Sequence, residues 1–229
     1  MQRFRLRSSG TRCLITCNGC DCRVLPDRDL EVMEWEECYR GEETPWDLGA
    51  AAPPLLELLE TRPAEIWGEG RVLVPGCGLG HDAAALQKSG HDVLGLDLAP
   101  SALAGAQARY GAEVIWLEGD FFDPELAKAH AVGAIFEHTC FCAIDPEQRG
   151  DYVEAAMRWL KPGGKLVGIF FLDPPRREDG EAGPPYRVGR DEIRKLFAGG
   201  FRILSEVSPK RTHPEREGRE WVVEFVRMF

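Results

Sequence analysis

Three glycines stand at every second position directly after a short run of β-prone residues. Residues 72–75 lead into Gly76, Gly78 and Gly80, and a second β-prone run ends in Asp97 about 20 residues further on. Glycine lets the backbone approach a ligand where a β-carbon would clash, and the helix expected next points unpaired N–H groups at the same place. A carboxylate at the end of the following strand can accept hydrogen bonds from both hydroxyls of a ribose. This spacing predicts a site for an adenosine-containing cofactor.

The glycine spacing also discriminates between cofactors. Dinucleotide-binding turns follow the pattern G-x-G-x-x-G, in which the helix faces a pyrophosphate, whereas this turn is G-x-G-x-G. No Lys or Arg occurs between Val72 and Gln87 to face a phosphate. S-adenosylmethionine has no phosphate and has a positively charged sulfonium, so the turn favours this methyl donor over NAD. A tight loop after any buried strand can carry similar glycines, so the interpretation also depends on Asp97 and the elements that follow.

The overall composition is that of an ordinary globular protein. A chain of 229 residues is long enough for one α/β domain with a substantial core. The formal net charge of −10 leaves no excess of cations for a phosphate backbone, and no apolar run reaches the roughly 18 residues of a membrane span. We therefore expect a small-molecule substrate, no nucleic-acid or membrane partner, and a monomer or weak homo-oligomer.

Cysteine is the residue type whose distribution is least ordinary, with eight in the chain. Cys77, Cys140 and Cys142 fall at the ends of expected buried strands, which favours a reducing, cytoplasmic setting over disulfide bonds. Four more cluster near the N-terminus, at Cys13, Cys17, Cys20 and Cys22.

The N-terminal cluster admits several interpretations. Cys17 and Cys20 have the spacing of a zinc or redox pair, but no second pair completes a metal site. The first 20 residues also contain four arginines and no acid, so a targeting segment or an appended segment before a functional start at Met33 are alternatives. We expect residues 1–30 to form a disordered tail without a metal.

Strand-like and helix-like segments alternate through residues 31–229, which we expect to form a single domain. Strands are expected at residues 71–75, 92–97, 114–117, 131–136 and 165–172, then as an antiparallel pair at 201–207 and 221–228. Helices are expected at residues 29–39, 53–60, 81–89, 100–109, 146–160 and 191–198, with a turn at 161–164. The alternation predicts an α/β fold with a doubly wound, mostly parallel sheet. Such sheets bind ligands beyond the carboxyl ends of their strands, where Gly76, Asp97, Asp120 and Glu137 fall.

Several longer strings are more specific than the glycines. They are WEECYR (35–40), TPWD (44–47), VPGCGLGHD (74–82), GLD (95–97), GDFF (119–122), FCAI (141–144), LKPGG (160–164) and GPPY (183–186). With these strings the chain resembles the class I S-adenosylmethionine-dependent methyltransferases. More narrowly it resembles the thiopurine S-methyltransferase superfamily, and within it the halide/thiol methyltransferases. The resemblance covers roughly residues 31–229 and implies a Rossmann-like, seven-stranded sheet with an antiparallel final strand and an N-terminal helical cap.

The resemblance also implies which residues contact the cofactor. Trp35 and Trp46 match cap aromatics that close over S-adenosylmethionine, and the face of a tryptophan suits a sulfonium. Tyr39 stands where the halide/thiol branch often has another tryptophan. Gly76, with Gly78 beside it, matches the turn against the amino-acid part of the cofactor.

Further matches concern the nucleoside and the acceptor. Asp97 matches the ribose-binding acid, Asp120 the acceptor for the adenine amino group, and Phe121 the ring that stacks on adenine. Cys140 and Tyr186 are candidate walls of the acceptor pocket, although each has an ordinary structural alternative, packing for the cysteine and a loop anchor for the tyrosine.

Glu137 and His138 are the main departure from the resembled branch, which tends to have Asp-Tyr there. His138 is expected beside the cofactor and acceptor, as a contact or as a base for thiol deprotonation, because its unperturbed pKa is near 6.5. The alternative is a strand-end histidine with a satisfied hydrogen bond. Glu137 is expected in the acceptor pocket.

The expected reaction is methyl transfer from S-adenosylmethionine to a small, soft nucleophile such as a thiol, hydrosulfide or halide. A halide or thiolate needs no general base, so proximity, alignment and desolvation would supply the catalysis. One alternative is a methyltransferase for a hydroxyl, carboxyl or metalloid acceptor, with acid–base work by Glu137 and His138. Another is a non-catalytic S-adenosylmethionine-binding domain, and a nicotinamide dehydrogenase is least favoured.

Overall fold

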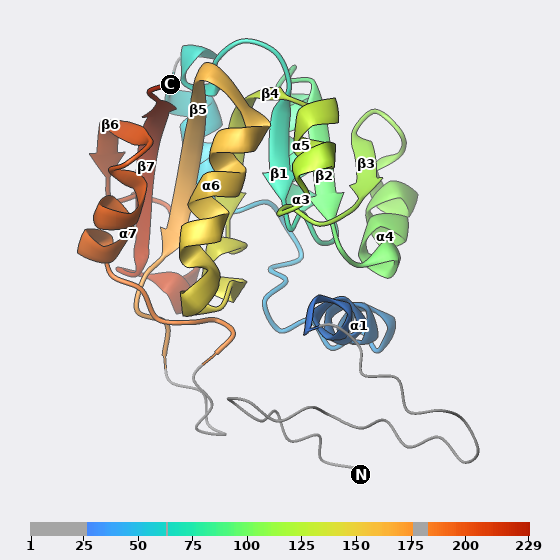
Figure 1. Cartoon of the computed structure of the whole chain (residues 1–229). Helices are drawn as coiled ribbons and strands as arrows, with labels where there is room; N and C mark the ends of the chain where they lie inside the picture. Colours follow the sequence, from blue (N-terminus) through green and yellow to red (C-terminus); the bar gives the residue numbers. More distant parts are fainter. Residues whose placement is uncertain (1–26, 63, 176–182) are drawn as a thin grey trace.

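The computed structural model describes residues 27–62, 64–175 and 183–229 (Figure 1). The expected tail, with its four cysteines and the possible targeting segment, lies outside the described residues up to residue 26. Its last residues belong to the first helix, which begins at Asp27.

A seven-stranded sheet of order β3-β2-β1-β4-β5-β7-β6 forms the centre of the protein. All neighbouring strands are parallel except β7, which runs antiparallel to both β5 and β6. This arrangement confirms the expected doubly wound, mostly parallel sheet and its antiparallel final strand. The strands are β1 (Val72–Pro75), β2 (Val93–Asp97), β3 (Ile115–Glu118), β4 (Val132–His138), β5 (Leu160–Phe171), β6 (Phe201–Val207) and β7 (Glu220–Arg227).

Helices separate the strands and begin with recognisable signals. Proline stands in the first turn of α2, α4 and α5, where its missing N–H has no helical partner to lose. The helices are α1 (Asp27–Arg40), α2 (Pro53–Thr61), α3 (His81–Lys88), α4 (Pro100–Tyr110), α5 (Pro124–Ala129), α6 (Arg149–Trp159) and α7 (Arg190–Phe197). Short 3-10 turns are η1 (Ala64–Trp67), η2 (Phe141–Ala143), η3 (Pro146–Gln148) and η4 (Pro214–Arg216).

The sheet buries both faces, and the alternation along β1 shows how. Leu73 packs into the core that contains Trp159 of α6, whereas Val72 and Val74 pack into the core that contains Leu55 of α2. Successive strand residues point to opposite faces, so an uninterrupted apolar run is the pattern of a strand covered on both sides.

Two segments differ from the sequence-based expectation. The turn expected at residues 161–164 is absorbed into β5, which starts at Leu160. Leu160 pairs with Val132 and Lys165 pairs with Ala134, so the residues between them bulge from a strand that continues through them. The helix expected at 146–160 begins only at Arg149, after the short turn η3, and the six-residue helix α5 was not expected.

The N-terminal helix lies beyond the carboxyl ends of β1 and β2 (Figure 1). Glu36 of α1 accepts hydrogen bonds from the backbone N–H (3.0 Å) and the hydroxyl (2.5 Å) of Ser101, in the first turn of α4. A carboxylate is favourable there because the helix N-terminus carries unpaired N–H groups and partial positive charge. This contact positions the cap over the carboxyl edge of the sheet.

The described ranges contain neither a membrane-spanning helix nor a cluster of metal ligands. No helix in them has both the length and the apolar character needed to cross a membrane. Within the same residues, no three His, Cys, Asp or Glu side chains gather as metal ligands would.

Candidate active site

The glycine turn after β1 adopts a conformation that only glycine takes easily. Gly76 and Gly78 have φ values of 57° and 52°, in the left-handed region that is unfavourable for L-residues with a β-carbon. A β-carbon on residue 78 would lie 2.7 Å from the hydroxyl oxygen of Tyr39. One on residue 76 would lie 3.2 Å from the sulfur of Cys140. The turn therefore presents bare backbone to its surroundings.

Asp97 fixes this turn from the end of β2. Its Oδ2 accepts a hydrogen bond from the backbone N–H of Gly78 (2.8 Å), and its Oδ1 accepts one from Ala99 (2.9 Å). Burial raises the pKa of the Asp97 carboxyl, although these backbone hydrogen bonds act in the opposite direction. The carboxylate thus links the glycine turn to the start of α4.

Three aromatic side chains of the cap come together above the turn. Tyr39 and Trp35 belong to α1, and both lie edge-on to Trp46, with ring centroids 5.9 and 5.2 Å away. The indole N–H of Trp46 donates to the hydroxyl oxygen of Tyr39 (3.3 Å). Burial, and secondarily the charge of Asp97, raises the pKa of the Tyr39 hydroxyl. This hydroxyl is therefore a neutral hydrogen-bonding group at physiological pH.

A cavity of about 70 Å³ lies between the cap and the glycine turn. Five of the expected site residues line it: Tyr39, Trp46, Gly76, Gly78 and His138. Trp35 packs behind Trp46 and does not line the cavity. Asp97 lies beneath the turn and does not line the cavity either. Two carboxylates that were not expected, Asp47 and Asp82, complete the polar wall.

The expected adenine pair lies outside this cavity. Oδ1 of Asp120 accepts a hydrogen bond from the N–H of Phe122 (2.8 Å). The Phe121 ring is 7% exposed and packs against Tyr152 (4.9 Å between centroids) and parallel to Trp159 (6.2 Å). Most of this ring is therefore committed to the core.

Glu137 does not face the cavity with His138. Adjacent residues of a strand point to opposite faces, and Glu137 points into the core, where it is 1% exposed. It accepts hydrogen bonds from the Tyr152 hydroxyl (2.5 Å) and from the N–H of Phe141 (2.8 Å). Burial raises its pKa to about 7. Glu137 therefore supports the turn after β4, in which Thr139 has a φ of 64°.

The remaining acceptor-pocket candidates also lie off the cavity. The Cys140 thiol packs against Gly76, and burial raises its pKa well above the usual range, so it is not a reactive thiolate. The N–H of Tyr186 donates to the carbonyl oxygen of Cys142 (2.7 Å), which anchors the chain that enters α7.

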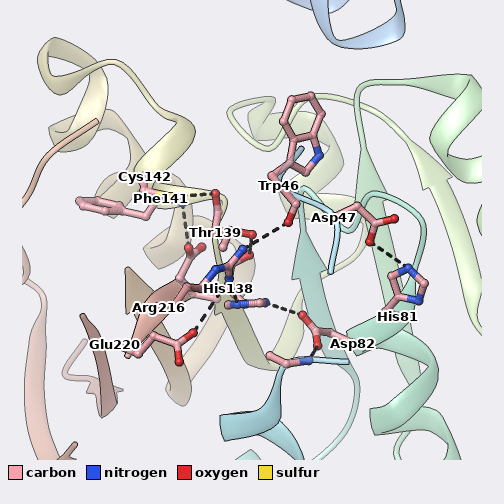
Figure 2. Close-up of polar contacts among 12 residues, drawn as sticks. Trp46, Asp47, His81, Asp82, His138, Thr139, Phe141, Cys142, Arg216 and Glu220 are labelled. Carbon is pink, nitrogen blue, oxygen red and sulfur yellow. Dashed lines mark hydrogen bonds and ion pairs between the residues drawn. The ribbon is translucent and has the colours of Figure 1, made fainter. Parts of the chain in front are cut away.

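His138 is held between two charged side chains that sequence analysis did not connect with it (Figure 2). Its Nδ1 lies 2.7 Å from Oδ2 of Asp82, and its Nε2 lies 2.8 Å from Nη1 of Arg216. Arg216 is 7% exposed and also donates to the carbonyl oxygen of Trp46 (3.2 Å). Both ring nitrogens of His138 are thus occupied.

Asp82 has a second partner and keeps its charge. Its Oδ1 accepts a hydrogen bond from the N–H of Ala52 (2.8 Å). Burial alone would raise the pKa of this carboxyl, but the neighbouring His138 and His81 and the hydrogen bonds lower it overall. From the sequence alone, Asp82 could be connected only with the helix dipole of α3, because its partners lie far away in the sequence.

His81, on the opposite side of the cavity, has one hydrogen-bonded ring nitrogen and one at ion-pair distance from a carboxylate. Its Nδ1 lies 2.6 Å from the hydroxyl of Tyr110, and its Nε2 lies 3.0 Å from Oδ1 of Asp47 (Figure 2). Asp47 belongs to the cap loop that carries Trp46. His138 is therefore linked to Trp46 through Arg216, and His81 contacts Asp47 directly. Both links join the cap loop to the rest of the domain.

The site fits S-adenosylmethionine in its chemistry. The turn is a cradle that a β-carbon would fill, and the described lining contains two carboxylates, two cap aromatics and no Lys or Arg. A phosphate would be poorly placed there, whereas a sulfonium is attracted to carboxylates and to aromatic faces.

Comparison with known proteins agrees with an S-adenosylmethionine site. The sequence model of the thiopurine S-methyltransferase (TPMT) family matches residues 30–228. Thiocyanate methyltransferase 1 of Arabidopsis thaliana is 33% identical over 207 residues, 84% of each chain. Probable thiol methyltransferase 2 of the same plant is 34% identical over 192 residues, 81% of each chain.

A solved structure shows the same fold. The 1,6-didemethyltoxoflavin-N1-methyltransferase of Burkholderia thailandensis, which holds its substrate and S-adenosylhomocysteine, is 18% identical, covers 94% of both chains and has a TM-score of 0.65. Fold, site and relatives together define an S-adenosylmethionine-dependent methyltransferase with the class I fold. Within that class, the chain belongs to the thiopurine S-methyltransferase family.

Proposed function

We propose that this protein transfers the methyl group of S-adenosylmethionine to a small, soft anion: a thiolate, hydrosulfide, thiocyanate or halide. The acceptor classes are those expected from the sequence, extended by the thiocyanate and thiol methyltransferases that the chain resembles. The nucleophile–methyl bond forms as the sulfonium–methyl bond breaks, the electron pair stays on sulfur, and S-adenosylhomocysteine leaves.

The observation that supports an anionic acceptor is that both ring nitrogens of His138 are engaged, by Asp82 and by Arg216. His81 is bonded to Tyr110 through Nδ1, and its Nε2 lies 3.0 Å from Oδ1 of Asp47 without hydrogen-bond geometry. A hydroxyl acceptor would need a base within hydrogen-bond reach. A thiolate or halide arrives already charged and needs none.

The residues of this chain would orient the two reactants and exclude water from them. Gly76 and Gly78 would bring backbone into contact with the cofactor, and Asp97 would accept hydrogen bonds from its ribose. Asp120 would accept from the adenine amino group, and the exposed edge of Phe121 would be the part of that ring available to adenine. Trp46 and Tyr39, with Trp35 behind Trp46, would cover the reacting atoms and exclude water, which leaves an anion poorly solvated and more reactive.

His138 lines the cavity and supports Arg216. The buried guanidinium touches two residues that line the cavity, His138 and Trp46, and its charge favours an anion there. Glu220 lies 4.0 Å from Nη1 of Arg216 and offsets part of that charge. Glu137 supports the turn after β4, Cys140 packs against Gly76, and Tyr186 anchors its loop to Cys142.

An acceptor panel tests the proposal. Purified protein with S-adenosylmethionine is offered iodide, thiocyanate, hydrosulfide and aromatic thiols, and in parallel hydroxyl, carboxyl and arsenite acceptors. Mass spectrometry then measures S-adenosylhomocysteine and methylated products. The proposal expects turnover with the soft anions. Turnover with oxygen or metalloid acceptors alone would contradict it, and cofactor binding without any turnover would favour a non-catalytic domain.

The cellular setting is part of the same proposal. Four cysteines in the described part of the chain are free thiols, and Cys142 is buried, which supports a reducing, cytoplasmic compartment. The net charge of −10 supports a small molecule over a nucleic acid as partner. Cell fractionation followed by immunodetection tests the compartment.

A further inference from the structure

The hydrogen-bonding groups around His138 determine which of its nitrogens carries the proton. A carboxylate can only accept hydrogen bonds and a guanidinium can only donate them. Asp82 faces Nδ1 at 2.7 Å and Arg216 faces Nε2 at 2.8 Å (Figure 2). Nδ1 must therefore carry the hydrogen and Nε2 must offer its lone pair. This arrangement is the neutral Nδ1–H tautomer.

The lone pair on Nε2 is one of several contacts that hold Arg216 beside the cavity. The Arg216 side chain also contacts the Trp46 carbonyl oxygen (3.2 Å), the Phe171 ring (5.3 Å from Cζ to the centroid) and Glu220 at 4.0 Å. Arg216 sits in η4, remote from the cap in the sequence. The contact between His138 and Arg216 thus joins the cap loop, β4 and η4 at one point.

A second proton on His138 would break this junction. An Nε2–H group would then face an N–H group of Arg216 at hydrogen-bond distance, with two positive charges in contact. Asp82 would attract the charged ring, while Arg216 would repel it. Glu137, the preceding residue on β4, has a pKa raised to about 7 by burial, so at acid pH its carboxyl is largely neutral. Glu220 contacts Arg216 from β7, Cys142 lies near Arg216, and His81 lies near Asp82 on α3.

We propose that Asp82 and His138 are positioning residues for Arg216: Asp82 holds His138 in the neutral Nδ1–H tautomer, and Arg216 keeps its place beside the acceptor only while His138 is uncharged. The inference rests on the proposed function only for the identity of the acceptor. The inference predicts that activity toward an acceptor whose charge does not change with pH depends on the protonation state of His138.

Two substitutions separate the tautomer from simple packing. In His138→Gln, the amide N–H₂ can donate to Asp82 and the amide oxygen can accept from Arg216, so both contacts persist without a titrating group. In Asp82→Asn, the N–H of Ala52 still needs an acceptor, so the amide oxygen faces Ala52 and the N–H₂ faces Nδ1. That orientation favours the Nε2–H tautomer, whose N–H then opposes Arg216.

Nitrogen-15 NMR of histidine-labelled protein determines the tautomer of His138 and needs no methyl acceptor. The chain has five histidines, and the signals lost in His138→Gln identify those of His138. We expect a protonated Nδ1 and an unprotonated Nε2 at pH 8, and the reverse in Asp82→Asn. An Nε2–H tautomer in the wild-type protein, or an unchanged tautomer in Asp82→Asn, would overturn the proposal.

The pH profile of kcat/KM for iodide measures how protonation of His138 affects activity, because iodide has the same charge throughout the range. In the wild-type protein kcat/KM should fall about tenfold per pH unit once His138 is protonated, as for a single titrating group. In His138→Gln, kcat/KM taken relative to that variant's own value at pH 8 should lack this acid limb, whatever the absolute activity of the variant. Glu137→Gln, which removes the other titrating group of β4, should keep the limb.

The opposite pattern, an acid limb retained in His138→Gln or lost in Glu137→Gln, would overturn the proposal. Absence of turnover with every soft anion would instead contradict the proposed function, and the NMR result alone would then decide on the tautomer.

Discussion

The hydroxyl oxygen of Tyr39 lies 2.7 Å from the place where a β-carbon on residue 78 would stand. The cap and the glycine turn are thus in direct contact, and the turn has no room for a side chain. Burial raises the pKa of this hydroxyl, first through desolvation and then through the nearby Asp97, so the contact is made by a neutral phenol over the whole physiological range. The cap is part of the site, since it closes the cavity that the turn opens.

Replacement of Gly78 by alanine should weaken cofactor binding. The new β-carbon would meet Tyr39 and would have to adopt a φ near 52°, which costs roughly 1–2 kcal/mol for an L-residue. We expect about a tenfold or greater rise in the Kd for S-adenosylmethionine, measured by calorimetry. Gly150→Ala is the matched control, because nothing lies within 4 Å of that β-carbon position. Equal affinities in the two variants would contradict the role of the turn.

Trp46→Leu should discriminate between the charged cofactor and its neutral product. If the indole faces the sulfonium, its removal costs S-adenosylmethionine roughly 0.5–2 kcal/mol of cation–π attraction, whereas S-adenosylhomocysteine has no such charge to lose. Calorimetric titration of the same variant with both compounds provides an internal control. An equal loss of affinity for the two would show that Trp46 acts only through packing.

Glu36→Ala should loosen the cap without unfolding the domain. Its carboxylate accepts two hydrogen bonds from Ser101 at the start of α4, a helix-capping contact worth about 1 kcal/mol. We expect a several-fold weaker affinity for S-adenosylmethionine and a Tm lower by only about 2–4 °C, measured by calorimetry and thermal denaturation. Glu37→Ala, an exposed neighbour on the same helix, should leave affinity unchanged. A similar loss in both variants would contradict the docking contact.

Glu137 should make the free energy of unfolding depend on pH. Its pKa rises from 4.5 to about 7 on folding, chiefly through burial. Between these values the unfolded chain has lost a proton that the folded chain still holds, so its stabilising contribution is complete below pH 4.5 and is lost as the pH rises through 7. The difference amounts to about 3 kcal/mol.

Urea denaturation of wild type and Glu137→Gln across this pH range measures the effect. The amide can still accept from Phe141 and interact with Tyr152, so the fold should persist. The stability of the wild-type protein relative to the variant should fall between pH 4.5 and 7. A constant difference would show that Glu137 does not titrate in this window.

The cofactor turn could be predicted from sequence because its signals are local. Glycine spacing, the β-prone run before Gly76 and the acid that ends the next strand all lie within one strand–helix–strand unit, and the structure places them as expected. The aromatic cap was expected from the resemblance, and the structure brings Tyr39 and Trp46 to the cavity. Trp35 reaches the site only through Trp46.

The other half of the site depends on contacts between distant segments. Asp82 and Arg216 lie 56 and 78 residues from His138, and nothing in their local sequence links them. Glu137 shows a different limit. Neighbouring residues of a strand face opposite ways, so Glu137 and His138 do not face the cavity together, and Glu137 lies in the core.

We propose that the site methylates an acceptor that is already an anion. The most direct measurement compares an aromatic thiol with the phenol of the same ring, at a pH where the thiol is ionised and the phenol is not, by following S-adenosylhomocysteine release. We predict turnover of the thiol at least 100-fold faster than that of the phenol, about 2.7 kcal/mol of discrimination. Comparable rates for the two acceptors would reveal a general base in the site and would contradict the account.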